Sequence, residues 1–350
     1  MFREMFWPYF PDYFRFTEDG DLLRFLNEKD QDWRLCSAAV RQNGLSLRYV
    51  INQHPFTVLE AVRRNGLALQ YVKEQTDLNA LEAVKQNYLA IQYVKNKTDQ
   101  MWLEVVKQNG LFLDQVDNKT DEICLAAVKQ RGLALRYVEN QTEEMCLIAV
   151  KKIGRALEYV KNKTRDICLA AVRQSGCSLQ YVDVQTEKMC LEAVKQDGWA
   201  LKHVKEQSDL ICLEAVKRCG RALMYVKIKT EEMCLAAVRR SYQSIKYIDE
   251  MTNPILLEAV THNSGRALKL INDPTEEICI AAVRANCRAF LYVKNQTEDI
   301  CIEAVRQDGA ILEDVREQTE EICLEAVRQN GKVLRFVKNQ TEEMCIEAVR

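Results

Sequence analysis

The chain has 350 residues, 47% of them apolar and 29% charged, with a formal net charge of −2 at pH 7. These proportions are ordinary for a soluble folded protein, and no apolar run approaches the roughly 18 residues that a membrane-spanning helix requires. The small net charge gives no overall attraction to nucleic acid, so only a local basic stripe could bind it. We therefore expect a soluble protein with no membrane partner.

The first 31 residues are rich in aromatic side chains and lack the apolar stretch and cleavage site of a signal peptide. We predict that residues 1–31 form an N-terminal cap, whose aromatic side chains cover the open end of the repeats that follow. The alternative is a docking segment for a partner, built on Phe6, Trp7, Tyr9, Phe10, Tyr13 and Phe14.

From Asp32 onward a unit of 22 residues recurs, and its commonest wording is TEEMCLEAVRQNGLALQYVKNQ. A period of this length predicts a solenoid, in which each unit buries its apolar face against its neighbours. We therefore predict one repeat domain over residues 32–350, with fourteen complete units and an incomplete fifteenth. The fifteenth unit stops at Arg350 within its first helix. This suggests that the chain was cut or that its natural form ends with an exposed apolar edge. The units begin at residues 32, 54, 76, 98, 120, 142, 164, 186, 208, 230, 252, 275, 297, 319 and 341.

Each unit, with places counted from its first residue, predicts two short helices. Thr at the first place is a helix N-cap, Asp32 and Ser208 are expected to act in the same way, and only His54 breaks the rule. Apolar residues at the fourth, fifth, eighth and ninth places form one buried stripe of the first helix. Gly at the thirteenth place suits a left-handed residue that ends this helix.

The second helix carries Leu at the sixteenth place and Val or Ile at the nineteenth, which lie on one side. Helices this short are marginal in isolation, so stacking must stabilise them. The sequence thus predicts an all-α fold, an α-solenoid of about fourteen two-helix repeats with an N-terminal cap. One extra residue between Val260 and Gly265 predicts a local kink.

Cysteine fills the fifth place of eleven units, and such regular spacing suggests metal binding. However, there is no C-x-x-C motif, and Val58, Ala80 and Leu256 occupy the same place in other units. We interpret these cysteines as buried free thiols and predict no metal and no cofactor. Free thiols imply a reducing compartment, which favours the cytoplasm.

A basic residue fills the tenth place of nearly every unit. The plain interpretation is a cation near each helix C-terminus that pairs with Glu three residues earlier, as Glu82 with Lys85. The functional interpretation is a phosphate-binding rail for single-stranded nucleic acid, helped by a row of Tyr at the eighteenth place. In the first six units the rail consists of Arg41, Arg63, Lys85, Lys107, Lys129 and Lys151.

The fourteenth place changes from Leu to polar residues along the chain, which a core position would not do. We therefore predict that it lies, with the seventeenth place, on an exposed face that binds a partner protein. The predicted binding residues are Leu45, Leu67, Leu89, Leu111, Leu133, Arg155, Trp199, Arg221, Arg266 and Arg288.

No catalytic set is evident. The three histidines, His54, His203 and His262, lie in different units, and neither a Gly-rich phosphate loop nor a nucleophile motif is present. The sequence therefore predicts a non-enzymatic scaffold or adaptor for a partner protein of unknown identity. Single-stranded nucleic-acid binding is the alternative, and an enzyme whose active part lies beyond Arg350 is a third possibility.

The wording LEAVRRNGLALQYV at residues 59–72, and LEAVKQNYLAIQYV at residues 81–94, resembles the repeat of domain of unknown function 4116. The resemblance covers residues 32–350 and leaves residues 1–31 outside it. Members of that family are similar repeat proteins of large DNA viruses, protists and some intracellular bacteria. The resemblance thus implies a viral or effector origin, with action in a host cytoplasm, and it carries over no binding or catalytic residue.

Overall fold

The computed structural model describes residues 20–350, and within this range every element is helical. The six aromatic residues of the alternative docking segment lie outside the described residues. Contacts divide the chain into two compact units, with the boundary between Ala170 and Ala171. We call these the N-terminal unit and the C-terminal unit and describe each by itself.

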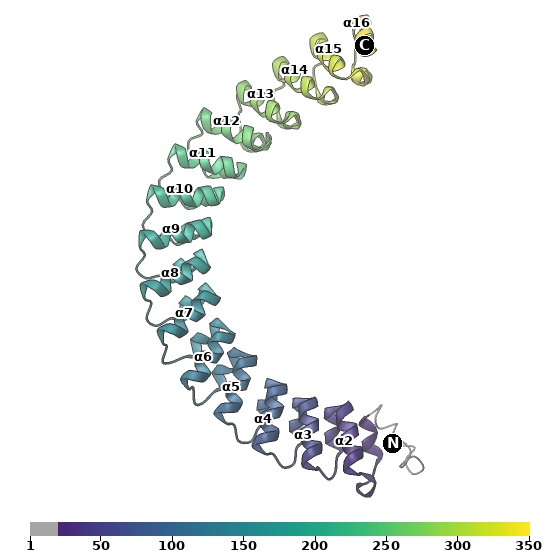
Figure 1. Cartoon of the computed structure of the whole chain (residues 1–350). Helices are drawn as coiled ribbons and strands as arrows, with labels where there is room; N and C mark the ends of the chain where they lie inside the picture. Colours follow the sequence, from purple (N-terminus) through teal and green to yellow (C-terminus); the bar gives the residue numbers. More distant parts are fainter. Residues whose placement is uncertain (1–19) are drawn as a thin grey trace. The chain divides into compact units, whose positions relative to one another are not determined.

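Each repeat begins with an α-helix, of ten residues in all but the last repeat, and successive helices lie side by side within each unit (Figure 1). The N-terminal unit holds α2 (Trp33–Gln42), α3 (Pro55–Arg64), α4 (Asp77–Gln86), α5 (Asp99–Gln108), α6 (Asp121–Gln130) and α7 (Glu143–Lys152). The unit boundary falls within α8 (Arg165–Gln174). The C-terminal unit continues with α9 (Glu187–Gln196), α10 (Asp209–Arg218), α11 (Glu231–Arg240), α12 (Asn253–His262), α13 (Glu276–Ala285), α14 (Glu298–Gln307), α15 (Glu320–Gln329) and α16 (Glu342–Ala348).

The second helix of each complete repeat is a short 3₁₀ helix, which follows its α-helix after a single residue except after α12, where three residues intervene. In the N-terminal unit these are η3 (Gly44–Tyr49), η4 (Gly66–Tyr71), η5 (Tyr88–Tyr93), η6 (Gly110–Gln115), η7 (Gly132–Tyr137) and η8 (Gly154–Tyr159), preceded by η1 (Gly20–Phe25) and η2 (Glu28–Asp30). In the C-terminal unit they are η9 (Gly176–Tyr181), η10 (Gly198–His203), η11 (Gly220–Tyr225), η12 (Tyr242–Tyr247), η13 (Arg266–Leu270), η14 (Cys287–Tyr292), η15 (Gly309–Asp314) and η16 (Gly331–Phe336). The predicted two-helix repeat is therefore confirmed.

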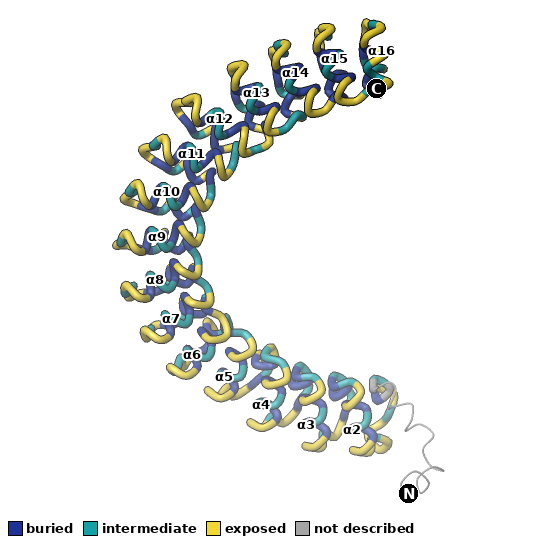
Figure 2. The backbone as a smooth tube through the Cα atoms, turned by 45° about the horizontal axis from the view of Figure 1, so that its top comes forward, coloured by how far each residue is buried: buried dark blue, intermediate teal, exposed yellow. Residues whose placement is uncertain are grey.

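The core of each unit lies between its row of α-helices and its row of 3₁₀ helices (Figure 2). In the first fourteen repeats the eighth and ninth places are fully buried, as Ala83 and Val84 show, and the sixteenth-place Leu69 and Leu135 are buried as well. Because each of these side chains packs against adjacent repeats, the helices gain from stacking the stability that they lack alone. The predicted core positions are confirmed except near the C-terminal end, where Leu334 is half-buried and Val349 is 86% exposed.

The predicted N-caps are confirmed for many repeats. Thr98 Oγ1, for example, accepts a hydrogen bond from the backbone N–H of Met101 at 3.4 Å. His54, which was expected to break the rule, caps α3 through Nδ1, which accepts from the N–H of Phe56 at 3.2 Å. Asp32 precedes α2 but its side chain makes no capping hydrogen bond, so that expectation was wrong.

The prediction that the thirteenth-place glycine ends the α-helix in a left-handed conformation was wrong. The residue before it, such as Asn65, has extended backbone, and among the described glycines only Gly265 has a positive φ. Where glycine occurs, it allows a close approach of the next repeat instead: a Cβ at Gly66 would lie 2.3 Å from the carbonyl oxygen of Ala83 in the next repeat.

The extra residue in the repeat that begins at Thr252 is absorbed in the turn after α12. Ser264 and Gly265 adopt positive φ values of 52° and 71°, and the N–H of Gly265 bonds to the carbonyl oxygen of Val260 at 2.8 Å. Neighbouring repeats make this turn with one extended residue. Across residues 20–350, every helix is too short or too polar to cross a bilayer.

Candidate functional site

The fourteenth and seventeenth places form one stripe along each 3₁₀ helix, which we call the 3₁₀ stripe. These places are three residues apart, and a 3₁₀ helix has three residues per turn, so their side chains lie one above the other. The seventeenth place is exposed throughout, as at Gln70, Asp114 and Lys202. The seventeenth place thus faces solvent on the second helices.

In the N-terminal unit a leucine fills the fourteenth place of five successive 3₁₀ helices. Leu89 is 39% exposed, while the other four are half-buried. The five are Leu45, Leu67, Leu89, Leu111 and Leu133. The expected exposure of this row is therefore partial, because each leucine also leans on its neighbours.

Packing does not require leucine at this place. Arg155 and Arg221 occupy it in 3₁₀ helices of the same length, and both side chains are exposed. By contrast, the sixteenth place, two residues on, is buried in those helices at Leu157 and Leu223. The leucine row is thus an apolar addition to a surface that folds equally well with charged residues.

The eighteenth-place tyrosines, predicted as base-stacking platforms, are half-buried beside the stripe. Several aromatic faces are already covered by a cation of the preceding residue. The guanidinium of Arg48 lies 4.5 Å from the ring centre of Tyr49, and that of Arg136 lies 4.4 Å from Tyr137. A stacking base would have to displace these cations.

In the C-terminal unit the 3₁₀ stripe is basic. From η10 to η14 its ten places hold six cations and no carboxylate: Lys202, Arg221, Lys246, Arg266, Lys269 and Arg288. His203 lies next to this stripe, and burial, followed by the charge of Lys202, lowers its pKa. It therefore adds no positive charge at neutral pH.

The tenth-place cations lie on the α-helices and are mostly paired. In one repeat after another, the cation contacts the seventh-place glutamate of the next α-helix: Arg41 with Glu60 at 2.7 Å, Arg63 with Glu82 at 2.8 Å, Arg173 with Glu192 at 3.1 Å, Arg239 with Glu258 at 2.6 Å, Arg284 with Glu303 at 3.2 Å and Arg306 with Glu325 at 2.7 Å. Within a repeat, Lys85 and Lys107 contact Glu82 and Glu104 at 3.1 and 2.8 Å. We call this alternation the ion-pair ladder.

The ladder neutralises most of the predicted nucleic-acid rail. A hydrogen bond from Arg63, followed by one from Lys85, lowers the pKa of Glu82, so this carboxylate stays charged. Among the described residues of the N-terminal unit, Lys129 and Lys151 are the only rail cations without an ion pair. The seventh place of their repeats holds Ala126 and Ile148 instead of glutamate. Four of its six cations, Arg41, Arg63, Lys85 and Lys107, thus face glutamates.

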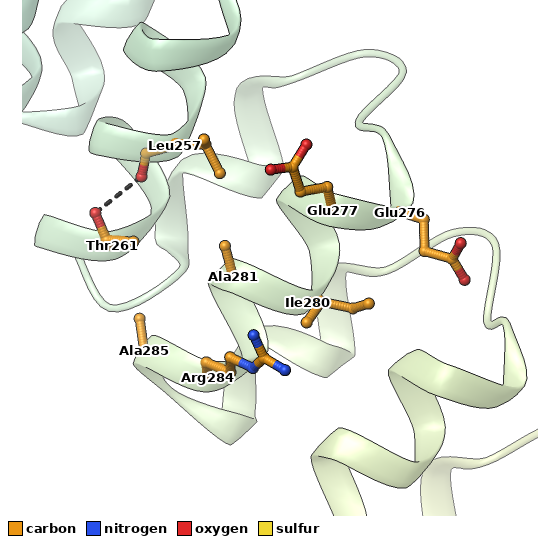
Figure 3. Close-up of a pocket in the computed structure, with 8 residues that line it drawn as sticks. All are labelled: Leu257, Thr261, Glu276, Glu277, Ile280, Ala281, Arg284 and Ala285. Atoms are coloured by element: carbon orange, nitrogen blue, oxygen red, sulfur yellow. Dashed lines mark hydrogen bonds between the residues drawn. The ribbon is translucent and has the colours of Figure 1, made fainter.

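The ladder also breaks between α12 and α13, where a hollow of about 770 Å³ opens (Figure 3). Thr261 replaces the tenth-place cation, and Ala281 and Ala285 replace the glutamate and glutamine of other repeats. The Thr261 hydroxyl donates back to the carbonyl oxygen of Leu257 at 2.8 Å. The hollow is therefore the space that longer side chains fill elsewhere.

Glutamine ends many of the repeats, where it has a role that the sequence did not reveal. Gln141 Nε2 donates to the carbonyl oxygen of Tyr159 at 2.8 Å, and its Oε1 accepts from the N–H of Lys161 at 3.0 Å. Gln185 and Gln207 bond to the next repeat in the same way. The regular spacing of glutamine was the available signal, but only the fold shows that its amide bridges two repeats.

The fifth-place cysteines are buried, except Cys345 in α16. Several thiols lie within 4 Å of a bridging glutamine, such as Cys146 Sγ at 3.7 Å from Gln141 Oε1. Burial raises the pKa of Cys36 and Cys301 to about 11. Among residues 20–350, no three His, Cys, Asp or Glu side chains are grouped so that they could hold a metal ion.

The model of the family described as "Domain of unknown function (DUF4116)" matches residues 142–187 and 297–342. No curated protein and no solved structure matches this chain. Each matched segment covers two consecutive repeats. The remaining complete repeats have a similar sequence and the same pair of helices. The chain therefore carries DUF4116 repeats at residues 142–187 and 297–342.

Proposed function

We propose that this chain is a non-enzymatic scaffold that binds a partner protein along the 3₁₀ stripe. The observation that carries the proposal is the leucine row from Leu45 to Leu133, which recurs at a place where the fold accepts arginine. A row of partly exposed leucines costs solubility, and in soluble proteins such rows mark binding sites. A partner that covers them would gain free energy from the apolar area removed from water.

The polar residues beside the leucines suit a protein partner. Arg48, Gln70 and Gln92 occupy the seventeenth place next to the leucine row and are exposed. Protein interfaces combine an apolar centre with a polar rim. The continuation of the stripe through Arg155, Trp199 and Arg221 adds Arg and Trp, which are enriched at the energetic centres of interfaces.

A capture experiment with two matched variants tests this proposal. The first variant combines Leu67→Ser, Leu89→Ser and Leu111→Ser on the stripe. The control combines Leu78→Ser and Leu210→Ser, which are 58% and 52% exposed on α4 and α10. We expect a protein that binds the natural chain and the control to be lost from the stripe variant, and equal retention by all three would refute the proposal.

Single-stranded nucleic-acid binding through the tenth-place rail is the alternative. Its support is limited to Lys129 and Lys151, which are the rail cations that do not pair with a glutamate of the ion-pair ladder. A salt titration with labelled RNA and DNA separates the two functions, because phosphate binding weakens steeply with rising salt. Strong binding that Lys129→Ala and Lys151→Ala abolish would favour the alternative.

We also propose that the chain works in a reducing cytoplasm, which would be that of a host if the protein is viral. The support is its set of fourteen free cysteines, most of them buried. Oxidising compartments favour disulfides in proteins rich in cysteine. Cell fractionation with a tagged chain tests the location, and recovery from a secretory compartment would contradict it.

A further inference from the structure

The basic part of the 3₁₀ stripe carries cations without a carboxylate partner, whereas many of the tenth-place cations on the α-helices are paired. In the part of the chain that the structure describes, none of its six cations forms an ion pair with a carboxylate. Elsewhere on the stripe, Arg48 contacts Asp21 and Arg155 contacts Glu158, both at 3.2 Å. We call the six unpaired residues the basic stripe: Lys202, Arg221, Lys246, Arg266, Lys269 and Arg288.

Several other cations of the same repeats are paired. On α11 and α13, Arg239 and Arg284 contact Glu258 and Glu303 in the ladder, and in the loops Lys229 contacts Asp249 at 2.8 Å. Acidic residues are therefore available in these repeats, but none lies at the fourteenth or seventeenth place of η10 to η14. Like charges on adjacent helices repel one another, and an anionic partner would relieve that repulsion.

The aromatic side chains of the basic stripe are engaged with its cations. The guanidinium of Arg221 lies 5.6 Å from the ring of Trp199, and Lys269 Nζ lies 4.4 Å from the ring of Tyr292. The ring of Tyr225 meets that of Trp199 at 5.8 Å in an edge-to-face arrangement. These faces are not free to stack on bases, which favours an anion without aromatic rings.

The spacing of the basic stripe fits an extended polypeptide. Its cations come from consecutive 3₁₀ helices, η10 to η14, and adjacent ones are in contact. Packed helices lie about 8–10 Å apart. An extended chain advances about 3.3 Å per residue, so every third side chain would meet the next repeat.

We propose that the basic stripe binds an extended acidic peptide segment, with Glu or Asp at about every third residue. This inference rests on the proposed function and gives the partner's chemistry at the C-terminal unit. Arginines at Arg221, Arg266 and Arg288 would bind carboxylates with bidentate geometry, and the intervening lysines would add charge. The leucine row of the N-terminal unit would contribute separately.

Fluorescence anisotropy with labelled peptides tests the proposal on the whole chain. The probe is an 18-residue peptide of six Glu-Ser-Ser triplets, compared with Gln-Ser-Ser triplets and with single-stranded RNA of 18 uridines. The test variant combines Arg221→Glu, Arg266→Glu and Arg288→Glu. The control combines Lys195→Glu, Lys217→Glu and Arg240→Glu, which change the net charge equally at exposed places on the α-helices.

We expect the Glu peptide to bind the natural chain and the control, and the affinity of the test variant to fall on the order of tenfold or more. The Gln peptide should not bind. Circular dichroism of both variants checks that they are folded. No binding of the Glu peptide, an equal loss in the control, or tighter binding of the RNA would overturn the inference.

The two proposals fail in different ways. The stripe variant with Ser at Leu67, Leu89 and Leu111 should bind the Glu peptide as the natural chain does. If the partner protein is lost from that variant while the Glu peptide never binds, only the acidic-peptide inference is wrong. If the Glu peptide binds while the leucine changes leave partner binding intact, the leucine row is not the interface.

Discussion

The guanidinium of Arg63 in α3 lies 2.8 Å from the carboxylate of Glu82 in α4, and the same contact recurs between other α-helices. Because these contacts cancel charge along the α-helices, that surface offers little net attraction to a phosphate backbone. The 3₁₀ stripe lacks this compensation in the C-terminal unit and carries apolar residues in the N-terminal unit. The two surfaces of the repeat are therefore chemically different.

The glutamates of the ladder should make stability depend on pH. Hydrogen bonds from Arg63, Arg239 and Arg306 lower the pKa of Glu82, Glu258 and Glu325, respectively. A lowered pKa in the folded state contributes stability that is complete above the ordinary carboxyl pKa and is lost as the pH falls through the lowered value. We expect Glu82→Gln to lower the free energy of unfolding in urea at pH 7 by less than about 1 kcal/mol, and to have a smaller effect at pH 3. Glu144→Gln, at an exposed glutamate outside the ladder, is the control, and equal effects of both changes would contradict this account.

The cysteines should react in two groups. Cys345 is exposed, whereas burial raises the pKa of Cys36 and Cys301 to about 11, so their thiolates are scarce at pH 8. Titration with a thiol reagent should show an early phase that Cys345→Ser diminishes and a slow remainder. In denaturant all fourteen should react. If all fourteen reacted equally fast in the folded protein, the buried placement of the fifth-place cysteines would be wrong.

Replacement of Gly66 by alanine should destabilise the stack. The added Cβ would lie 2.3 Å from the carbonyl oxygen of Ala83, and such overpacking costs about 1–3 kcal/mol. The converse change, Tyr88→Gly, places the usual residue at an equivalent position and serves as the comparison. Thermal unfolding measures both variants. A Gly66→Ala chain as stable as the natural one would show that the repeats separate easily at this contact.

Leu67 and Leu69 should differ in their effect on stability, although both belong to η4. Leu69 is fully buried, so Leu69→Ala should cost about 2–5 kcal/mol through the cavity that it leaves. Leu67 is half-buried, and Leu67→Ala should cost about 1 kcal/mol. Urea unfolding compares the two variants. Equal costs would place Leu67 in the core and would remove the leucine row from the candidate interface.

The sequence alone was sufficient to predict the repeat, its two helices and its buried places. These features follow from apolar spacing and from the capping threonines, both of which act within one unit. The role of the thirteenth-place glycine was mispredicted because its constraint comes from the next repeat, at the carbonyl oxygen of Ala83. The bridging role of Gln141 was missed for the same reason, since both of its partners, Tyr159 and Lys161, lie one repeat away.

The candidate site was predictable in part. The exposure of the seventeenth place and the exposure of Arg221 follow from polarity at a fixed place. Half-burial of Leu67 was not predictable, because it depends on how closely adjacent 3₁₀ helices pack. The unpaired state of the basic stripe likewise required the positions of carboxylates in neighbouring repeats.

Photo-crosslinking from single positions tests most directly whether the partner lies on the 3₁₀ stripe. Benzoylphenylalanine is placed at Leu89, which is 39% exposed on the stripe, and separately at Leu78, which is 58% exposed on α4. The account predicts that the partner protein crosslinks to the chain through position 89 and not through position 78. Crosslinking through position 78 alone would contradict it and would place the interface on the α-helices.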